Sequence, residues 1–226
     1  MNSKTIALNG AALKIIAMIA MTVDHVGLIL LDDYRPFRIV GRLAFPIFAY
    51  LLSEGCFYTK HKKRHFLEVL IAGLICQVGY FVSMGDMYLN VLLTFSLSIP
   101  LVYLTLAVKD KKAPPALFLG AVFLMIALCV LLERAGVYFD YGYAGVLLPV
   151  FAAMGNNKRG KLALTAVGLL LLAFIMRGNQ WYGLMALIPL SLYDGTRGKV
   201  KNKYAFYIFY PLHIVVIYGI SMLTNG

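Results

Sequence analysis

The sequence predicts an all-α membrane protein, a polytopic transmembrane helical bundle of about nine helices with a cytoplasmic N-terminus. Hydrophobic residues make up 61% of the 226 residues, against about 45–50% in an average soluble domain. They recur along the whole chain in runs of roughly 18–22 residues, the length at which a helix crosses a ~30 Å hydrocarbon core. The runs lack the period-two alternation of membrane β-strands. We therefore predict one transmembrane domain covering residues 1–226.

The apolar runs predict the helices in chain order. The first run follows Lys4 and Lys14 and resembles a signal peptide, but it lacks a small-residue cleavage site and is long enough to span, so we interpret it as the first helix. The sixth and eighth runs are short and could be tilted, partly re-entrant or buried among neighbours. The predicted helices cover residues 12–31, 37–58, 66–84, 88–108, 114–132, 142–154, 161–177, 181–193 and 204–223.

The basic residues predict the orientation. A net charge of +11 can indicate nucleic-acid binding, but here the charges fall in short inter-helix loops, so we expect a lipid bilayer and no nucleic acid as partner. One side carries Lys4, Lys60, Lys62, Lys63, Arg64, Lys109, Lys111, Lys112, Lys158, Arg159, Lys161, Arg197, Lys199, Lys201 and Lys203. The other side carries only Arg35, Arg38, Arg134 and Arg177. The positive-inside rule makes the first side cytoplasmic.

Cysteine usage gives no sign of a metal site or a disulfide framework. Cys56, Cys76 and Cys129 stand alone within apolar runs, and the sequence holds no CxxC motif or His/Cys cluster. We expect reduced cysteines that fill space in the bundle, and no metal.

Four ionisable residues stand out inside predicted helices, where each costs several kcal/mol unless it is paired, hydrated or useful. Asp24 and Arg42 lie at similar depth in the outer half of their helices and can form a buried pair. His213 lies near the midplane, within reach of His25. Asp24 and His25 point about 100° apart, so we expect Asp24 to neutralise Arg42 or to orient His213. The alternative is purely structural, an ion pair and two hydrogen-bonded histidines.

Weaker polar signals have structural explanations that we favour. Glu54 and Glu68 flank the basic segment 60–65, where interfacial carboxylates commonly pair with nearby lysines. Asn90 and Thr94 share one helix face and can form interhelical hydrogen bonds.

Two prolines interrupt predicted helices. Pro46 and Pro211 each remove a backbone hydrogen bond, so each predicts a kink. Pro211 lies two residues before His213, where a kink either opens space for a substrate or serves packing alone.

Several segments together resemble the TraX family of membrane acetyltransferases, which is placed in a wider superfamily of membrane acyltransferases. The similarity extends over almost the whole chain, and its most specific motifs are the first, second and last segments. One departure is Gln77, near which a proline would be expected. The matching segments are 13–18 (LKIIAM) leading into 21–27 (MTVDHVG), 41–48 (GRLAFPIF) followed by Glu54–Gly55, Asn90–Thr94, 140–142 (DYG) and 210–213 (YPLH).

The resemblance implies an acetyltransferase that moves an acetyl group from cytoplasmic acetyl-CoA to an acceptor amine or hydroxyl, in the bacterial inner membrane. The acceptor stays open: a protein N-terminus, a glycan or a lipid. On the matching segments we assign His25, Asp24 and His213 as catalytic residues. We assign Arg42, Lys14 and Asn90 to acetyl-CoA binding.

Two other functions remain open at this stage. A small secondary transporter for an anionic or proton-coupled substrate would share the intramembrane charges, although internal repeats are lacking. A non-catalytic membrane assembly protein would tolerate replacement of both histidines.

Overall fold

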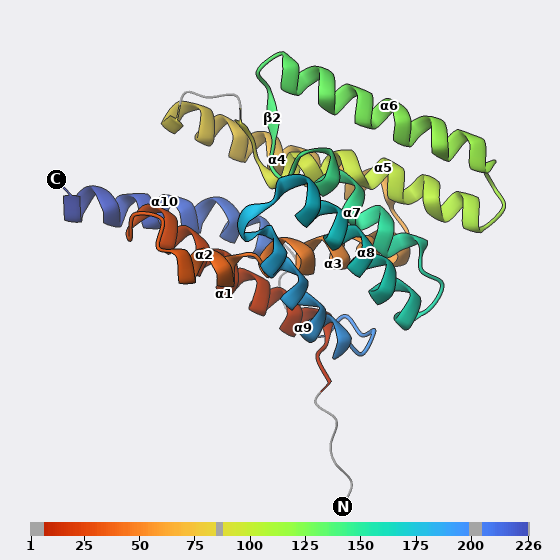
Figure 1. The fold of residues 1–226 in the computed structure, drawn as a ribbon, viewed down its shortest axis with the longest axis horizontal. Coiled ribbons are helices and arrows are strands. Elements are labelled where there is room, and N and C mark those ends of the chain that lie inside the picture. Colours follow the sequence, from red (N-terminus) through yellow and green to blue (C-terminus); the bar gives the residue numbers. More distant parts are fainter. Residues whose placement is uncertain (1–6, 85–87, 199–204, 226) are drawn as a thin grey trace, which may run out of the picture. The chain divides into compact units, whose positions relative to one another are not determined.

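A computed structural model of the chain describes residues 7–84, 88–198 and 205–225, and most of these residues are helical (Figure 1). The all-α bundle expected from the sequence is confirmed. The α-helices are α1 (Gly10–Ile29), α2 (Arg35–Gly41), α3 (Ala44–Tyr58), α4 (Lys62–Met84), α5 (Val91–Lys109), α6 (Pro115–Arg134), α7 (Gly142–Met154), α8 (Lys158–Met176), α9 (Leu187–Ser191) and α10 (Ala205–Asn225). A 3₁₀ helix, η1 (Gly178–Ala186), precedes α9.

Each predicted helix has a counterpart, but three differ from the prediction. The predicted helix 37–58 is divided into α2 and α3 at residues 42–43. Pro46 explains the break, because it has no N–H for the carbonyl of Arg42 and is tolerated only in the first turn of α3. The predicted helix 181–193 forms as η1 and α9. Pro211, in contrast, lies inside a continuous α10.

The third difference is at the start of α5, which the prediction placed at residue 88. Tyr88 and Leu89 instead form strand β1, which pairs in parallel with strand β2 (Tyr138–Phe139). The Asn90 side chain then caps α5 by accepting from Leu92 N at 3.0 Å, so the helix begins at Val91. Strands of only two residues are too short to show a recognisable alternation in the sequence.

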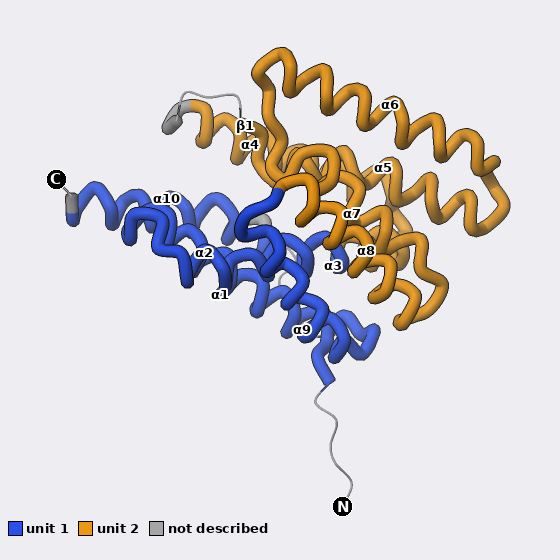
Figure 2. Tube along the Cα trace, viewed as in Figure 1, with its two compact units in different colours: residues 1–51, 177–226 blue, residues 52–176 orange. Residues whose placement is uncertain are grey.

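The chain divides into two compact units (Figure 2). Unit 1 comprises residues 1–51 and 177–226, and unit 2 comprises residues 52–176. The boundary falls inside α3, so the prediction of a single domain stays a prediction.

In unit 1, α1 packs against both α2 and α10. Lys14 of α1 lies over the ring of Phe206 at 4.5 Å, and farther along both helices His25 contacts His213. Contacts that advance together along both sequences mean that α1 and α10 run parallel, as Figure 1 also shows. Because α1 and α10 run in the same direction, the number of membrane crossings from the first to the last helix is odd, as predicted.

In unit 2, α5 packs against α4, α6 and α7, and α7 packs against α8. The short α7 is mostly buried, as the sequence allowed. Thr94 joins α5 to the segment after β2 by donating to the Asp140 carbonyl at 2.9 Å. Nearby, burial and the Asp140 carboxylate raise the pKa of the Tyr88 hydroxyl, which donates to that carboxylate at 3.2 Å.

Exposed apolar side chains identify a multi-pass membrane protein. Six helical segments among the described residues are long and apolar enough to span a bilayer. On α6, Leu119, Phe123 and Leu124 are 66%, 71% and 68% exposed. Such an apolar surface is unfavourable in water and favourable against lipid chains. The predicted loop residues Lys4, Lys199, Lys201 and Lys203 lie outside the described residues.

Single cysteines at positions 62 and 224 test the orientation, in a background without the three native cysteines. Because α1 and α10 run parallel, a cytoplasmic N-terminus requires Thr224 to be outside and Lys62 inside. A membrane-impermeant maleimide should therefore label position 224 in intact cells and position 62 only after permeabilisation. Labelling of both from the same side would contradict the nine-helix topology.

Candidate active site in unit 1

The polar centre of unit 1 is built on the tight α1–α2 hairpin. Tyr34 N donates to the Gly27 carbonyl at 2.9 Å, and a Cβ on Gly27 would come within 2.6 Å of the Phe37 Cβ. The turn is sharp because Asp32 and Asp33 take left-handed conformations, with φ of 47° and 62°, which aspartate tolerates better than most residues. This close approach turns the arginines of α2 and its C-terminus toward Asp24.

The Asp24 carboxylate lies between two guanidinium groups. Arg42 Nη2 donates to Asp24 Oδ1 at 2.7 Å, and Arg38 Nη1 donates to Asp24 Oδ2. Asp24 is only 9% exposed, so water does little to screen these pairs. The predicted Asp24–Arg42 pair is confirmed, and it has a third member that the sequence analysis counted as a loop residue.

Arg38 could have been found from spacing. It precedes Arg42 by four residues, and residues four apart on a helix lie on one face. The two arginines are also joined directly, because Arg42 Nε donates to the Arg38 carbonyl at 3.1 Å. On its outer side Arg38 Nε pairs with the exposed Asp33 at 2.9 Å. The charge of Arg38 is therefore shared between a buried and an exposed carboxylate.

His25 and His213 are in direct contact. His213 Nε2 lies 3.3 Å from His25 Nδ1, and the ring centroids are 4.9 Å apart in an edge-to-face arrangement. The expected approach of these two residues is confirmed. The Phe209 ring stacks on His213 with an interplanar angle of 6°.

The hydrogen bonds decide where the protons of a neutral histidine pair reside. His25 Nδ1 lies 2.9 Å from the Met21 carbonyl, and His213 Nδ1 lies 2.9 Å from the Phe209 carbonyl. Carbonyl oxygens only accept, so each Nδ1 carries hydrogen. The single His25 Nδ1–H is shared between the Met21 carbonyl and His213 Nε2. His25 Nε2 is left as the unprotonated nitrogen, and it has no hydrogen-bond partner among residues 7–84, 88–198 and 205–225.

Asp24 does not orient His213, contrary to one of the two expectations from the sequence. Within the described part of the chain, its carboxylate bonds to the two arginines, whereas His213 is oriented by the Phe209 carbonyl and by His25. The 100° offset between Asp24 and His25 explains the separation, because α1 presents them to different neighbours: α2 on one side and α10 on the other.

Apolar and aromatic side chains lie beside the histidine pair. Met21 and Ala44 are buried there, with Phe209 and Tyr210 packed against them. Lys14 lies earlier on α1, with its ammonium group over the Phe206 ring. A polar pair in such surroundings has few competing waters, which strengthens every charge interaction within it.

The remaining candidates lie in unit 2 and are engaged in structural bonds. Asn90 Nδ2 donates to the Gly73 carbonyl at 2.9 Å and to Gln77 Oε1 at 2.9 Å, while its Oδ1 caps α5. Its assignment to acetyl-CoA binding therefore gains no support from its contacts. Gln77, near which a proline was expected, is one of the two residues that hold the Asn90 side chain. Glu68 pairs at 2.9 Å with Arg64, which belongs to the basic segment 60–65 but is not one of the lysines expected as its partner.

Comparison with known proteins identifies the family. The model of the family described as TraX protein matches residues 9–221. The chain belongs to the TraX family. It is 32% identical to a probable fimbrial assembly protein of Dichelobacter nodosus, FimC of serogroup H1, over 99% of this chain and 100% of that protein. It is 26% identical to an uncharacterized protein of Rickettsia prowazekii (strain Madrid E), over 94% of this chain and 81% of that one. No solved structure matches the chain.

In this TraX-family chain, Asp24→Asn should destabilise the protein more than Arg42→Met. Without Asp24, Arg42 loses its carboxylate partner and Arg38 keeps only the exposed Asp33, a loss of about 3–5 kcal/mol. Without Arg42 the carboxylate keeps Arg38, so the loss should be smaller. Thermal unfolding of the purified variants in detergent measures the difference. Equal losses would contradict the three-membered cluster.

Gly41→Ala should also destabilise the protein, because a Cβ at this position would overlap the Asp24 side chain. Overpacking of this kind costs about 1–3 kcal/mol. Gly219→Ala is the matched control in the same unit, since no atom lies within 4 Å of a Cβ there and alanine favours helix. Thermal unfolding should place the first variant below the parent protein and the second at or above it; the reverse order would count against the close approach.

Proposed function

We propose that this protein is an integral membrane acetyltransferase of the bacterial inner membrane. It transfers an acetyl group from cytoplasmic acetyl-CoA to an acceptor amine or hydroxyl at or across the membrane. The observation that carries the proposal is the histidine pair, which leaves His25 Nε2 unprotonated in an apolar setting. An unprotonated imidazole nitrogen held in place by its other nitrogen is the group that general-base catalysis requires.

The reaction then proceeds as follows. His25 Nε2 takes the proton of the acceptor N–H or O–H while the acceptor atom bonds to the acetyl carbon. The C–S bond breaks, and the proton passes to the sulfur of the departing CoA. His213 acts by holding His25 Nδ1–H, which keeps Nε2 free. A covalent acetyl-imidazole on His25 is the other route.

The charged residues have supporting roles in this proposal. Arg42 stabilises oxyanion charge in the transition state or holds an acceptor carboxylate, and the Asp24 carboxylate keeps its guanidinium in position. Lys14 lies toward the end of α1 that the loop charges make cytoplasmic. It is therefore placed to attract an anionic CoA.

A second candidate function is a non-catalytic role in fimbrial assembly. The specific observation in its favour is the name of the D. nodosus relative, a probable fimbrial assembly protein. The same name favours a protein N-terminus, such as that of a fimbrial subunit, as the acceptor in the catalytic proposal. The two functions differ in what the histidines must do, because assembly without chemistry makes no demand on His25 Nε2.

Replacement of either histidine tests the proposal. His25→Ala should lower transfer of labelled acetyl from acetyl-CoA by about 10²–10⁴-fold, the usual contribution of a general base. His213→Ala should lower it too and should shift the pH profile of transfer, because His25 loses the partner that fixes its tautomer. Affinity for CoA, measured separately, should change little in both variants.

His61→Ala is the matched control, since His61 is an exposed histidine between α3 and α4. It should transfer acetyl at the parent rate. Retained transfer in both site variants would reject the mechanism and favour the assembly function. Joint loss of transfer and of CoA binding would assign the histidines to binding or structure instead of catalysis.

A further inference from the structure

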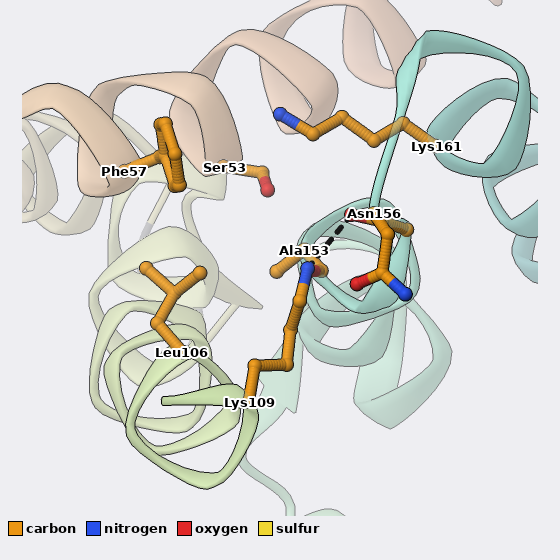
Figure 3. Close-up of a pocket in the computed structure, with 8 residues that line it drawn as sticks. Ser53, Phe57, Leu106, Lys109, Ala153, Asn156 and Lys161 are labelled. Carbon is orange, nitrogen blue, oxygen red and sulfur yellow. Dashed lines mark hydrogen bonds between the residues drawn. The ribbon is translucent and has the colours of Figure 1, made fainter. Parts of the chain in front are cut away.

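A small cavity lies wholly within unit 2, where the ends of α3, α5 and α7 meet the start of α8. Its volume is about 50 Å³, several times the ~10–15 Å³ that one water molecule requires. Figure 3 shows Ser53, Lys109 and Lys161 extending toward it from α3, α5 and α8. The cavity adjoins the basic segments at 109–112 and 158–161, on the side that the loop charges make cytoplasmic.

Ser53 is the unusual member of the lining. It is only 3% exposed, yet its hydroxyl makes no hydrogen bond within the described residues. The other buried serines of unit 2 behave differently: Ser96 and Ser98 donate to carbonyls of their own helix at 2.7 Å and 3.1 Å. No side-chain oxygen among the described residues is both fully buried and without a partner, so the Ser53 hydroxyl is accessible at the cavity and can donate to a ligand there.

Lys109 and Lys161 each have ammonium N–H donors that make no hydrogen bond within the described residues. Lys109 Nζ donates to the carbonyls of Ala153 at 2.9 Å and Gly155 at 2.7 Å, which uses two of the three hydrogens of an ammonium group. Lys161 Nζ pairs with Glu54 and lies over the Phe57 ring at 4.9 Å. One hydrogen on Lys109 and two on Lys161 therefore have no hydrogen-bond acceptor within the described part of the chain.

The charge of the site is positive. Two ammonium groups line the cavity, and no carboxylate of the described residues lines it with them. Glu54 pairs with Lys161, whereas Asp110, beside Lys109 in the sequence, is exposed and pairs with Lys112. Glu54 is 6% exposed, and its partner is Lys161 instead of the nearby lysines of segment 60–65 that the sequence favoured. The α8 N-terminus, which begins three residues after Gly155, adds the positive end of a helix dipole.

We propose that this cavity binds one phosphate group at the cytoplasmic face. A tetrahedral phosphate offers acceptor oxygens in several directions, which matches donors arriving from three helices, and lysine is a common phosphate ligand. The phosphate belongs either to a soluble compound such as CoA or to the headgroup of an anionic lipid. The proposal goes beyond acetyl transfer and does not depend on it, because binding is measured without turnover.

The sharpest test is a gain of binding. Glu54→Gln keeps the size of the side chain and its hydrogen bond to Lys161, but removes the charge that opposes an anion, so binding should tighten several-fold. Ser53→Ala should weaken binding about tenfold, the value of one hydrogen bond to a charged group. Ser98→Ala is the matched control, because it removes a buried hydroxyl that is bonded within its own helix, and it should bind as the parent does.

Two arms separate the sources of the phosphate. In the first, inorganic phosphate and CoA are titrated by calorimetry into lipid-free protein in nonionic detergent. In the second, the protein is placed in nanodiscs of phosphatidylcholine with or without phosphatidylglycerol, and retained lipid is counted by native mass spectrometry. The source of the phosphate is identified by the arm in which Glu54→Gln binds more tightly than the parent protein and Ser53→Ala binds more weakly. If neither variant changes binding in either arm, the cavity holds only water and the proposal is overturned.

Discussion

The polar centre of unit 1 depends on the ion pairs that the Asp24 carboxylate forms with two arginines. Two guanidinium groups converge on the carboxylate, and neither could remain buried in an apolar bundle without a counterion. The surrounding backbone is arranged to permit this contact. Gly41 has no side chain because Asp24 occupies that space, and the break between α2 and α3 at residues 42–43 leaves Arg42 at a helix end. An electrostatic requirement thus sets the shape of the α1–α2 hairpin.

Because Asp24 binds the arginines, the next residue on α1, His25, can contact a different helix. His25 turns toward α10 and meets His213, and each ring donates to a carbonyl of its own helix. A consecutive Asp–His pair therefore serves two different neighbours, one ionic and one imidazole. This separation gives His25 a defined tautomer without a carboxylate hydrogen-bonded to its ring, and it is the physical basis of the proposed acetyl transfer.

In unit 2, other residues pair the charged side chains and the carbonyls at a helix end. Lys109 binds the carbonyls at the C-terminus of α7, which are left without N–H partners at any helix end. Lys161 balances Glu54. These contacts join the ends of four helices, and the donors that remain after them line a cavity whose chemistry favours an anion.

The sequence by itself determined the class of the fold, the order of the helices and the identity of the two contacts in unit 1. Apolar run length is set by bilayer thickness, and the cost of lone charges in lipid leaves few partners for Asp24 or for a midplane histidine. Tertiary structure alone decided that Glu54 pairs with Lys161 instead of the nearby segment 60–65, and that β1 pairs with β2. Each of these depends on how helices distant in sequence are rotated about their axes, which the apolar pattern leaves undefined when lipid and protein interior are equally hydrophobic.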